Sequence, residues 1–332
     1  MVISLLLAIL ISLIILIISE SIAAFTFSLF IILSGTIVLQ RFQKYDRIFG
    51  QKLLYITFAV YSFFALLHYL DVSYFDNYIF PDEVNSFLPW TEYLQNSASL
   101  SSLYSKIFDD SILIDDRGYL FYIGSISYIT QNYFWENNQL VLFLSSVLFG
   151  CYNAILLYRL LLNYTTVKQA YNYALYYSLF SSVSLYSFVL LRDIHIACFY
   201  LCGFVIITNK FSWKGFFFLL ILTIVTWYFR FEHGIFYILF ILYYFYTNFK
   251  RFKFLFITTA VVVGVYFSAF IISNFARITN SFSHYVAYTG AHTLSKEESL
   301  AKYIWTLPSP FKEIGIILNS QIQPFPSWNN IA

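Results

Sequence analysis

Residues 71–117 read DVSYFDNYIF PDEVNSFLPW TEYLQNSASL SSLYSKIFDD SILIDDR, the longest polar interruption before the C-terminal tail. The stretch holds nine carboxylates against two cations, Lys106 and Arg117, and its centre is Phe80-Pro81-Asp82-Glu83. Long apolar runs lie on both sides of it. The polar stretch therefore divides a series of predicted helices, and it is the first place to look for chemistry.

The composition is that of a protein whose solvent is a lipid bilayer. Of the 332 residues, 60% are hydrophobic and 11% are charged, and the mean hydropathy is +0.70. Soluble domains carry about 25% charged residues. The 23% of aromatic residues suit belts of rings at the two membrane interfaces. We therefore predict an all-α, polytopic integral membrane protein.

Apolar length predicts where the chain crosses the membrane, because about 20 helical residues span the hydrocarbon core. Nine runs meet this expectation: residues 2–19, 22–40, 53–70, 140–162, 171–191, 194–208, 216–229, 235–249 and 254–275. The first two are separated only by Glu20-Ser21, which predicts a tight helical hairpin. The first run lacks the basic segment and the cleavage site of a removable signal peptide, so we expect it to remain as a helix.

We expect one transmembrane domain over residues 1–332, with a large outer loop at 71–138 and an outer tail at 276–332. Within the loop, residues 84–103 could form an amphipathic helix along the membrane surface. Residues 118–129 are apolar but too short to cross, which predicts an interfacial or re-entrant element.

Lysine and arginine in the short loops predict the orientation, because they concentrate on the cytoplasmic side. If the basic loop at 41–52 is cytoplasmic, eleven of the nineteen cations fall on that side with a single carboxylate, Asp46. The other sixteen carboxylates then face outward with eight cations. All five histidines also fall on the outer face. We therefore expect a multi-pass protein of the inner (plasma) membrane with a cytoplasmic N-terminus.

Two carboxylates of the outer loop are candidates for acid–base chemistry. Asp82 and Glu83 follow Pro81 directly, and a carboxylate at the membrane surface can take a proton from an attacking hydroxyl. A solvated acidic loop is the competing interpretation. The sequence identifies no cofactor with certainty; the pairs Asp109-Asp110 and Asp115-Asp116 could hold a divalent cation, or could simply be solvated.

Arginines recur at the outer ends of predicted helices. Arg192-Asp193 interrupts an apolar stretch, and the sequence Arg230-Phe231-Glu232-His233 follows the seventh span. Charges at a membrane edge are costly and are usually paired or functional. Arg192, Arg230 and Arg277 could grip an anionic phosphate from several sides, with Asp193 and His233 beside them. Local Arg–Asp pairing and snorkelling anchors are the alternatives.

The cysteine and basic residues argue against a disulfide-rich fold and against a nucleic-acid-binding protein. Cys151, Cys198 and Cys202 all lie in apolar runs and are too few for a disulfide framework, so we interpret them as small packing residues. No basic arm is present that would predict a nucleic-acid partner.

Several fragments resemble the glycosyltransferase-C superfamily, which includes protein O-mannosyltransferases, aminoarabinose transferases and many bacterial polysaccharide-cluster proteins. The resemblance rests on Pro81-Asp82-Glu83 in the first large outer loop, on the surface helices after it, and on Leu191-Arg192-Asp193. Pro324-Phe325-Pro326-Ser327-Trp328 is also similar to a Pro-Phe-Pro-Trp element of such polysaccharide proteins. The acidic loop departs from the family by following the third helix, where the family usually has it after the first.

The resemblance implies a function. A loop aspartate acts as base in that superfamily, the donor is a polyprenyl-phosphate-linked sugar, and transfer inverts the anomeric centre. Carried over, Asp82 is the base with Glu83 beside it, and Arg192 or Arg230 contacts the phosphate. The implied partners are the lipid-linked sugar, membrane lipids and a glycan, lipid or protein acceptor, in the synthesis of a bacterial surface polysaccharide or glycoconjugate.

Three other functions stay open. An O-antigen or capsule polymerase would also have many helices and outer arginines, and would use glycans linked to lipid diphosphate. A transporter or flippase would need charges near the bilayer midplane and helices broken by Gly or Pro; no proline lies inside a predicted span. A non-catalytic scaffold of a polysaccharide assembly complex is the third.

Overall fold

The computed structural model describes residues 2–70, 83, 87–108 and 116–248, together with single positions between 254 and 269 and residue 308. Their contacts divide the chain into Met1–Tyr244 and Phe245–Ala332. The second unit contributes to the described part only the end of the last helix and the single positions beyond it. All that follows concerns the first unit.

All regular secondary structure in the described part of the chain is helical, as predicted, and no strand occurs there. Its helices are α1 (Val2–Ser19), α2 (Ile22–Leu39), α3 (Lys44–Tyr69), α5 (Leu88–Gln95), α6 (Leu100–Phe108), α7 (Arg117–Tyr133), α8 (Leu140–Leu161), α9 (Val167–Phe180), α10 (Ser182–Tyr186), α11 (Asp193–Ile207), α12 (Trp213–Phe229) and α13 (Phe231–Asn248).

Within the described residues, four helices are long and apolar enough to cross a membrane: α1, α2, α3 and α8. Helices α11 and α12 and the Phe236–Asn248 part of α13 are apolar but shorter. The predicted spans at 2–19, 22–40 and 140–162 therefore coincide with helices that meet the criterion, and those at 194–208, 216–229 and 235–249 coincide with shorter ones. The ninth span, at 254–275, lies largely outside the described residues.

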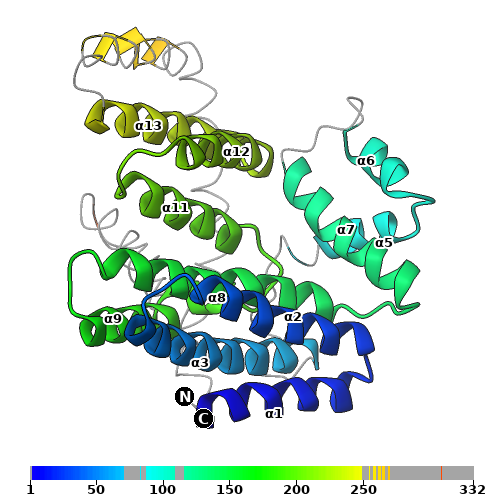
Figure 1. Cartoon of the computed structure of the whole chain (residues 1–332). Helices are drawn as coiled ribbons and strands as arrows, with labels where there is room; N and C mark the ends of the chain where they lie inside the picture. Colours follow the sequence, from blue (N-terminus) through cyan, green and yellow to red (C-terminus); the bar gives the residue numbers. More distant parts are fainter. Residues whose placement is uncertain are drawn as a thin grey trace. The chain divides into compact units, whose positions relative to one another are not determined.

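Helix α8 is the centre of the packing. It contacts α2, α3, α9 and α11, and α1 packs on α2 and α3 (Figure 1). Most of α8 is buried, whereas α1 buries one stripe that includes Ser4, Ala8 and Ser12. Small residues let membrane helices approach closely. The opposite face of α1 exposes large aliphatic side chains, as expected for a helix that faces lipid.

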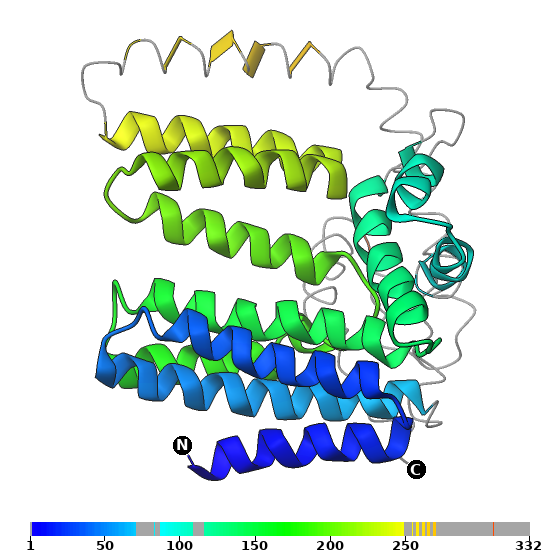
Figure 2. The ribbon, with the colours of Figure 1, turned by 45° about the vertical axis from the view of Figure 1, so that its right-hand side comes forward.

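Helices α5 and α6 pack against α7, and α7 also contacts α8 and α12 (Figure 2). The prediction of one surface helix over residues 84–103 is therefore wrong. Two helices form instead, and residues 96–99 separate them. The element predicted at 118–129 is a helix four residues longer at its C-terminal end, α7.

Two predicted boundaries differ for physical reasons. Helix α3 begins at Lys44, not at residue 53, because its basic first turns need not lie in hydrocarbon. The span predicted at 171–191 is not one helix: α9 ends at Phe180, and Ser181 is extended (φ −101°, ψ 171°). The hydroxyl of Ser181 accepts a bond from Val183 N–H and so caps α10.

Candidate active site

Glu83 is the one residue of the central acidic motif that the structure describes together with its contacts. Its side chain is only 3% exposed. Oε1 lies 2.7 Å from Nε2 of His68, near the end of α3, and Oε2 accepts a hydrogen bond of 2.8 Å from the backbone N–H of Leu190. Both oxygens are therefore engaged. Glu83 joins the end of α3 to the segment that precedes α11.

Two arginines predicted to hold phosphate each pair with a carboxylate. Arg192, at the N-terminal boundary of α11, forms an ion pair with Asp116, which directly precedes α7. The next residue, Asp193, lies 3.7 Å from a guanidinium nitrogen of Arg230, between α12 and α13. We call Asp116, Arg192, Asp193 and Arg230 the ion-pair row. It ties the start of α7 to the start of α11 and the junction of α12 with α13.

The two pairs of the ion-pair row differ in their surroundings. The side chains of Arg192 and Asp116 are 18% and 16% exposed, whereas those of Arg230 and Asp193 are 39% and 47% exposed. Water screens the second pair more strongly, so its net attraction is weaker. Arg230 can consequently exchange its carboxylate for another anion at lower cost than Arg192 can.

A buried polar group lies beside the ion-pair row. His195 is fully buried, with its Nδ1 3.3 Å from the carbonyl oxygen of Leu191. Its ring centroid lies 5.2 Å from that of Tyr119 and 4.1 Å from that of Phe149. Neither Nε2 of His195 nor the hydroxyl of Tyr119 has a hydrogen-bond partner among the described residues. Buried polar atoms in this state are uncommon and call for an explanation.

Tyr119 links the two parts of the site electrostatically. Burial raises the pKa of Tyr119 well above its usual value, and the nearby Tyr122, Glu83 and Asp193 raise it further. The phenol therefore stays protonated at physiological pH.

Local features of the chain hold these groups in place. Asn153 of α8 donates a hydrogen bond of 3.1 Å to the carbonyl oxygen of Ile194 and so anchors the start of α11. At Gly118 a Cβ would meet the backbone carbon of Tyr228 at 2.8 Å, so only glycine allows α7 and α12 to approach this closely. His233, the remaining predicted residue here, lies with its Nδ1 2.8 Å from the hydroxyl of Tyr200.

The structure thus brings together Glu83, Arg192, Asp193 and Arg230, while Asp82 and Arg277 lie outside the described residues. The sequence interpretation missed the roles of Asp116, Tyr119 and His195. A signal was available for His195, which follows Arg192-Asp193 by less than one helical turn. For Asp116, the sequence shows a carboxylate just before a predicted helical element, but it does not show that Arg192 is its partner.

The described residues contain no group of three or more His, Cys, Asp or Glu side chains that could hold a metal ion. Asp109, Asp110 and Asp115, which the sequence suggested as cation ligands, lie outside the described part. The arrangement therefore combines a buried, protonated phenol, a buried carboxylate whose two oxygens both have partners, and two arginines of unequal exposure. The chain matches no protein-family model, no curated protein and no solved structure.

Proposed function

We propose that this protein is a membrane glycosyltransferase that moves a sugar from a polyprenyl-phosphate donor to an acceptor hydroxyl, with inversion of the anomeric centre. The observation that carries the proposal is the ion-pair row beside the anchored Glu83. It combines a shielded arginine, a half-exposed arginine and a fixed carboxylate immediately after the candidate base, Asp82, in the sequence.

The surroundings of Arg230 fit a phosphate carried on an isoprenoid chain. Trp227, Tyr228 and Phe236, which flank it in the sequence, expose much of their apolar surface. A polyprenyl chain needs apolar surface and its phosphate needs a cation, and both are found at this helix junction. Here the phosphate replaces Asp193 as the partner of Arg230, while Arg192 stays with Asp116.

The proposed reaction uses each group once. Asp82 takes the proton of the acceptor hydroxyl, and the oxygen attacks the anomeric carbon as the bond to the donor phosphate breaks. The polyprenyl phosphate leaves as an anion that Arg230 stabilises, because a preorganised cation favours the charge that develops there. Glu83 acts as a positioning residue, and the buried Tyr119 phenol stays protonated.

The orientation inferred from lysine and arginine places this chemistry on the outer face of the plasma membrane. The end of α3, the start of α7 and the start of α11 then share that face with the loop at 71–138. Sugar transfer there would serve the synthesis of a surface polysaccharide or glycoconjugate.

The test is transfer of labelled sugar from synthetic polyprenyl-monophosphate donors by the purified full chain. We expect transfer by the wild type, loss of transfer in Asp82→Asn, and a fall of at least tenfold in Arg230→Ala. Arg159→Ala, at the last turn of α8, is the matched arginine control and should retain activity.

A polymerase would use a different donor, a glycan linked to lipid diphosphate. If no monophosphate donor reacts, while oligosaccharides linked to lipid diphosphate are joined into longer chains, the transferase proposal is wrong and the polymerase is favoured. Transfer that survives in Asp82→Asn would remove Asp82 as the base.

A further inference from the structure

Trp135 has a backbone conformation that is unusual for its residue type. It follows the end of α7 closely, and its φ of 55° lies in the left-handed region. Helices often end on a residue in this conformation, but that residue is usually glycine, because a Cβ makes the conformation unfavourable. A glycine would make the same turn without the steric penalty. The turn itself therefore does not require an indole.

The indole of Trp135 projects from the protein surface. Trp135 is 86% exposed, whereas the preceding Phe134 packs against the core. Tyr133, the last residue of α7, is 70% exposed, and Ile129, one turn earlier on the same face, is 42% exposed. We call Ile129, Tyr133 and Trp135 the aromatic tip of α7. A large side chain that is exposed in an unfavourable backbone conformation points to a binding role.

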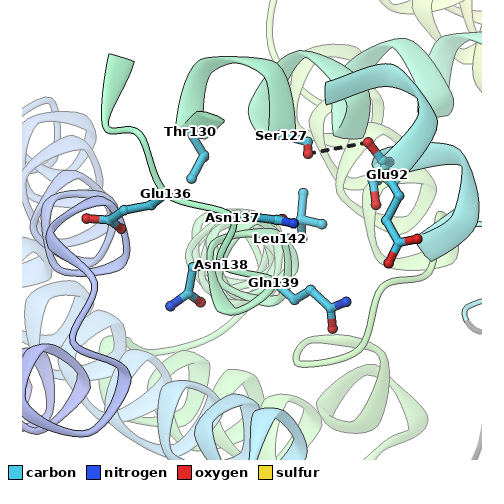
Figure 3. Close-up of a pocket in the computed structure, with 9 residues that line it drawn as sticks. Glu92, Ser127, Thr130, Glu136, Asn137, Asn138, Gln139 and Leu142 are labelled. Atoms are coloured by element: carbon cyan, nitrogen blue, oxygen red, sulfur yellow. Dashed lines mark hydrogen bonds between the residues drawn. The ribbon is translucent and has the colours of Figure 1, made fainter. Parts of the chain in front are cut away.

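Neighbouring contacts hold this turn in place. The backbone N–H groups of Phe134 and Glu136 lie 3.2 and 3.3 Å from the carbonyl oxygen of Thr130. The carboxylate of Glu136 accepts bonds from the N–H of Ile22 at 3.0 Å and from the hydroxyl of Ser21. Figure 3 shows the Glu136 side chain beside the blue ribbon of the N-terminal helices. Strained conformations persist where the surroundings fix them, and here the fixed point is the start of α2.

The same contact places the aromatic tip near the end of two candidate membrane helices. Helices α1 and α2 are apolar and long enough to cross a bilayer, and they meet at the turn around Glu20. Ile17 and Ile22, on either side of this turn, are 73% and 61% exposed, whereas Glu20 is charged. The boundary between hydrocarbon and water therefore falls at this turn. Because Glu136 binds the first residues of α2, the residue before it lies close to the same boundary.

We propose that the aromatic tip inserts into the headgroup zone of the bilayer and anchors the C-terminal end of α7 there. Indole and phenol rings favour this zone, because each combines a large apolar body with one polar group. The partner is a lipid surface, and the inference does not depend on the proposed transferase function. Helix α7 is then held by lipid at its C-terminal end and by the ion pair of Asp116 with Arg192 at its N-terminal end.

Fluorescence quenching in liposomes measures the depth of the indole. The full-length chain has six tryptophans, so the emission of Trp135 is taken as the difference between wild type and Trp135→Phe. We expect lipids with a spin label on the headgroup to quench this difference by roughly twofold, and lipids labelled at the end of the acyl chain to quench it less. Trp90→Phe is the matched control, because Trp90 is partly buried against the core and its emission should respond less.

Three quenching results would overturn the anchor. Quenching by iodide in the buffer but not by labelled lipid would place the indole in water. Stronger quenching by the acyl-chain label than by the headgroup label would place it in the hydrocarbon. Protection from every quencher would show that protein covers it, from this chain or from a second copy.

A pair of variants tests whether the indole is instead a structural residue. In detergent, Trp135→Gly should melt at the same temperature as Trp135→Ala or above it, because glycine adopts the left-handed conformation without strain. Both should melt close to the wild type, since the exposed indole packs little against the protein. Melting of both variants far below the wild type would show that the indole stabilises the fold, and would contradict the anchor.

Discussion

The Oε2 atom of Glu83 accepts a hydrogen bond of 2.8 Å from the backbone N–H of Leu190, a residue 107 positions later in the chain. The other oxygen of the same carboxylate lies 2.7 Å from Nε2 of His68. A single buried side chain therefore connects α3 to the segment that leads into α11. This contact places Glu83 near the helix ends where the ion-pair row lies.

Removing this carboxylate should destabilise the fold. In Glu83→Ala the N–H of Leu190 loses its buried acceptor and His68 loses its carboxylate contact, so we expect the free energy of unfolding to fall by about 3 kcal/mol. Unfolding in detergent measures this, with Glu92→Ala as the exposed glutamate control, expected within about 0.5 kcal/mol of wild type. Equal stability of the two variants would contradict the contact.

The two arginines of the ion-pair row should respond differently to substitution. Arg192→Ala leaves the shielded Asp116 without its cation and should cost about 2 kcal/mol of stability. Arg230→Ala breaks a half-exposed pair and should cost less than about 1 kcal/mol. We expect Arg230→Ala to lose sugar transfer while it remains folded. Thermal unfolding and transfer assays on the same preparations compare the two effects.

Glu136 should act as a cap for α2 from a distant part of the chain. Its carboxylate accepts from the N–H groups of Ile22 and Ala23, next to the N-cap Ser21, where the positive end of the helix dipole favours an anion. Glu136→Ala should lower the free energy of unfolding by about 1 kcal/mol. Glu136→Gln keeps an acceptor oxygen and should lose less, as unfolding titrations of both variants would show.

Alkaline pH should destabilise the protein through Tyr119. Because the folded-state pKa is raised above that of the unfolded chain, the folded state binds the phenol proton more tightly. The stabilisation is complete below about pH 10, the unfolded pKa, and falls as the pH rises above it. Tyr119→Phe should show a smaller loss of melting temperature between pH 9 and pH 11.5. An identical slope in wild type and variant would count against this contribution.

The proposed orientation predicts which side of the membrane each linker faces. In a background without the three native cysteines, a cysteine in place of Asn137 should react with a membrane-impermeant maleimide added to intact cells. A cysteine in place of Lys168, in the first turn of α9, should react only after the membrane is opened. Both positions are exposed, so burial does not confound the comparison. Labelling of both from the same side would overturn the assignment.

The sequence alone determined the helical class and the positions of several helices. The predicted spans at 2–19, 22–40 and 140–162 match α1, α2 and α8 within one residue at each end. These boundaries are local, because the length of an apolar run and the polar residues that end it are read directly from the chain. The sequence likewise shows arginines at the ends of predicted helices, where placing a charge at the membrane edge is energetically unfavourable.

The tertiary structure decided which groups meet. The sequence does not show that Asp116 pairs with Arg192, that Glu83 is enclosed by His68 and Leu190, or that Glu136 caps α2. Each contact joins segments that are distant in the chain, and a buried carboxylate takes whichever donors the packing of helices brings to it. Charge and hydropathy act along the sequence, but ion pairs and caps depend on distances between helices, which only the folded chain sets.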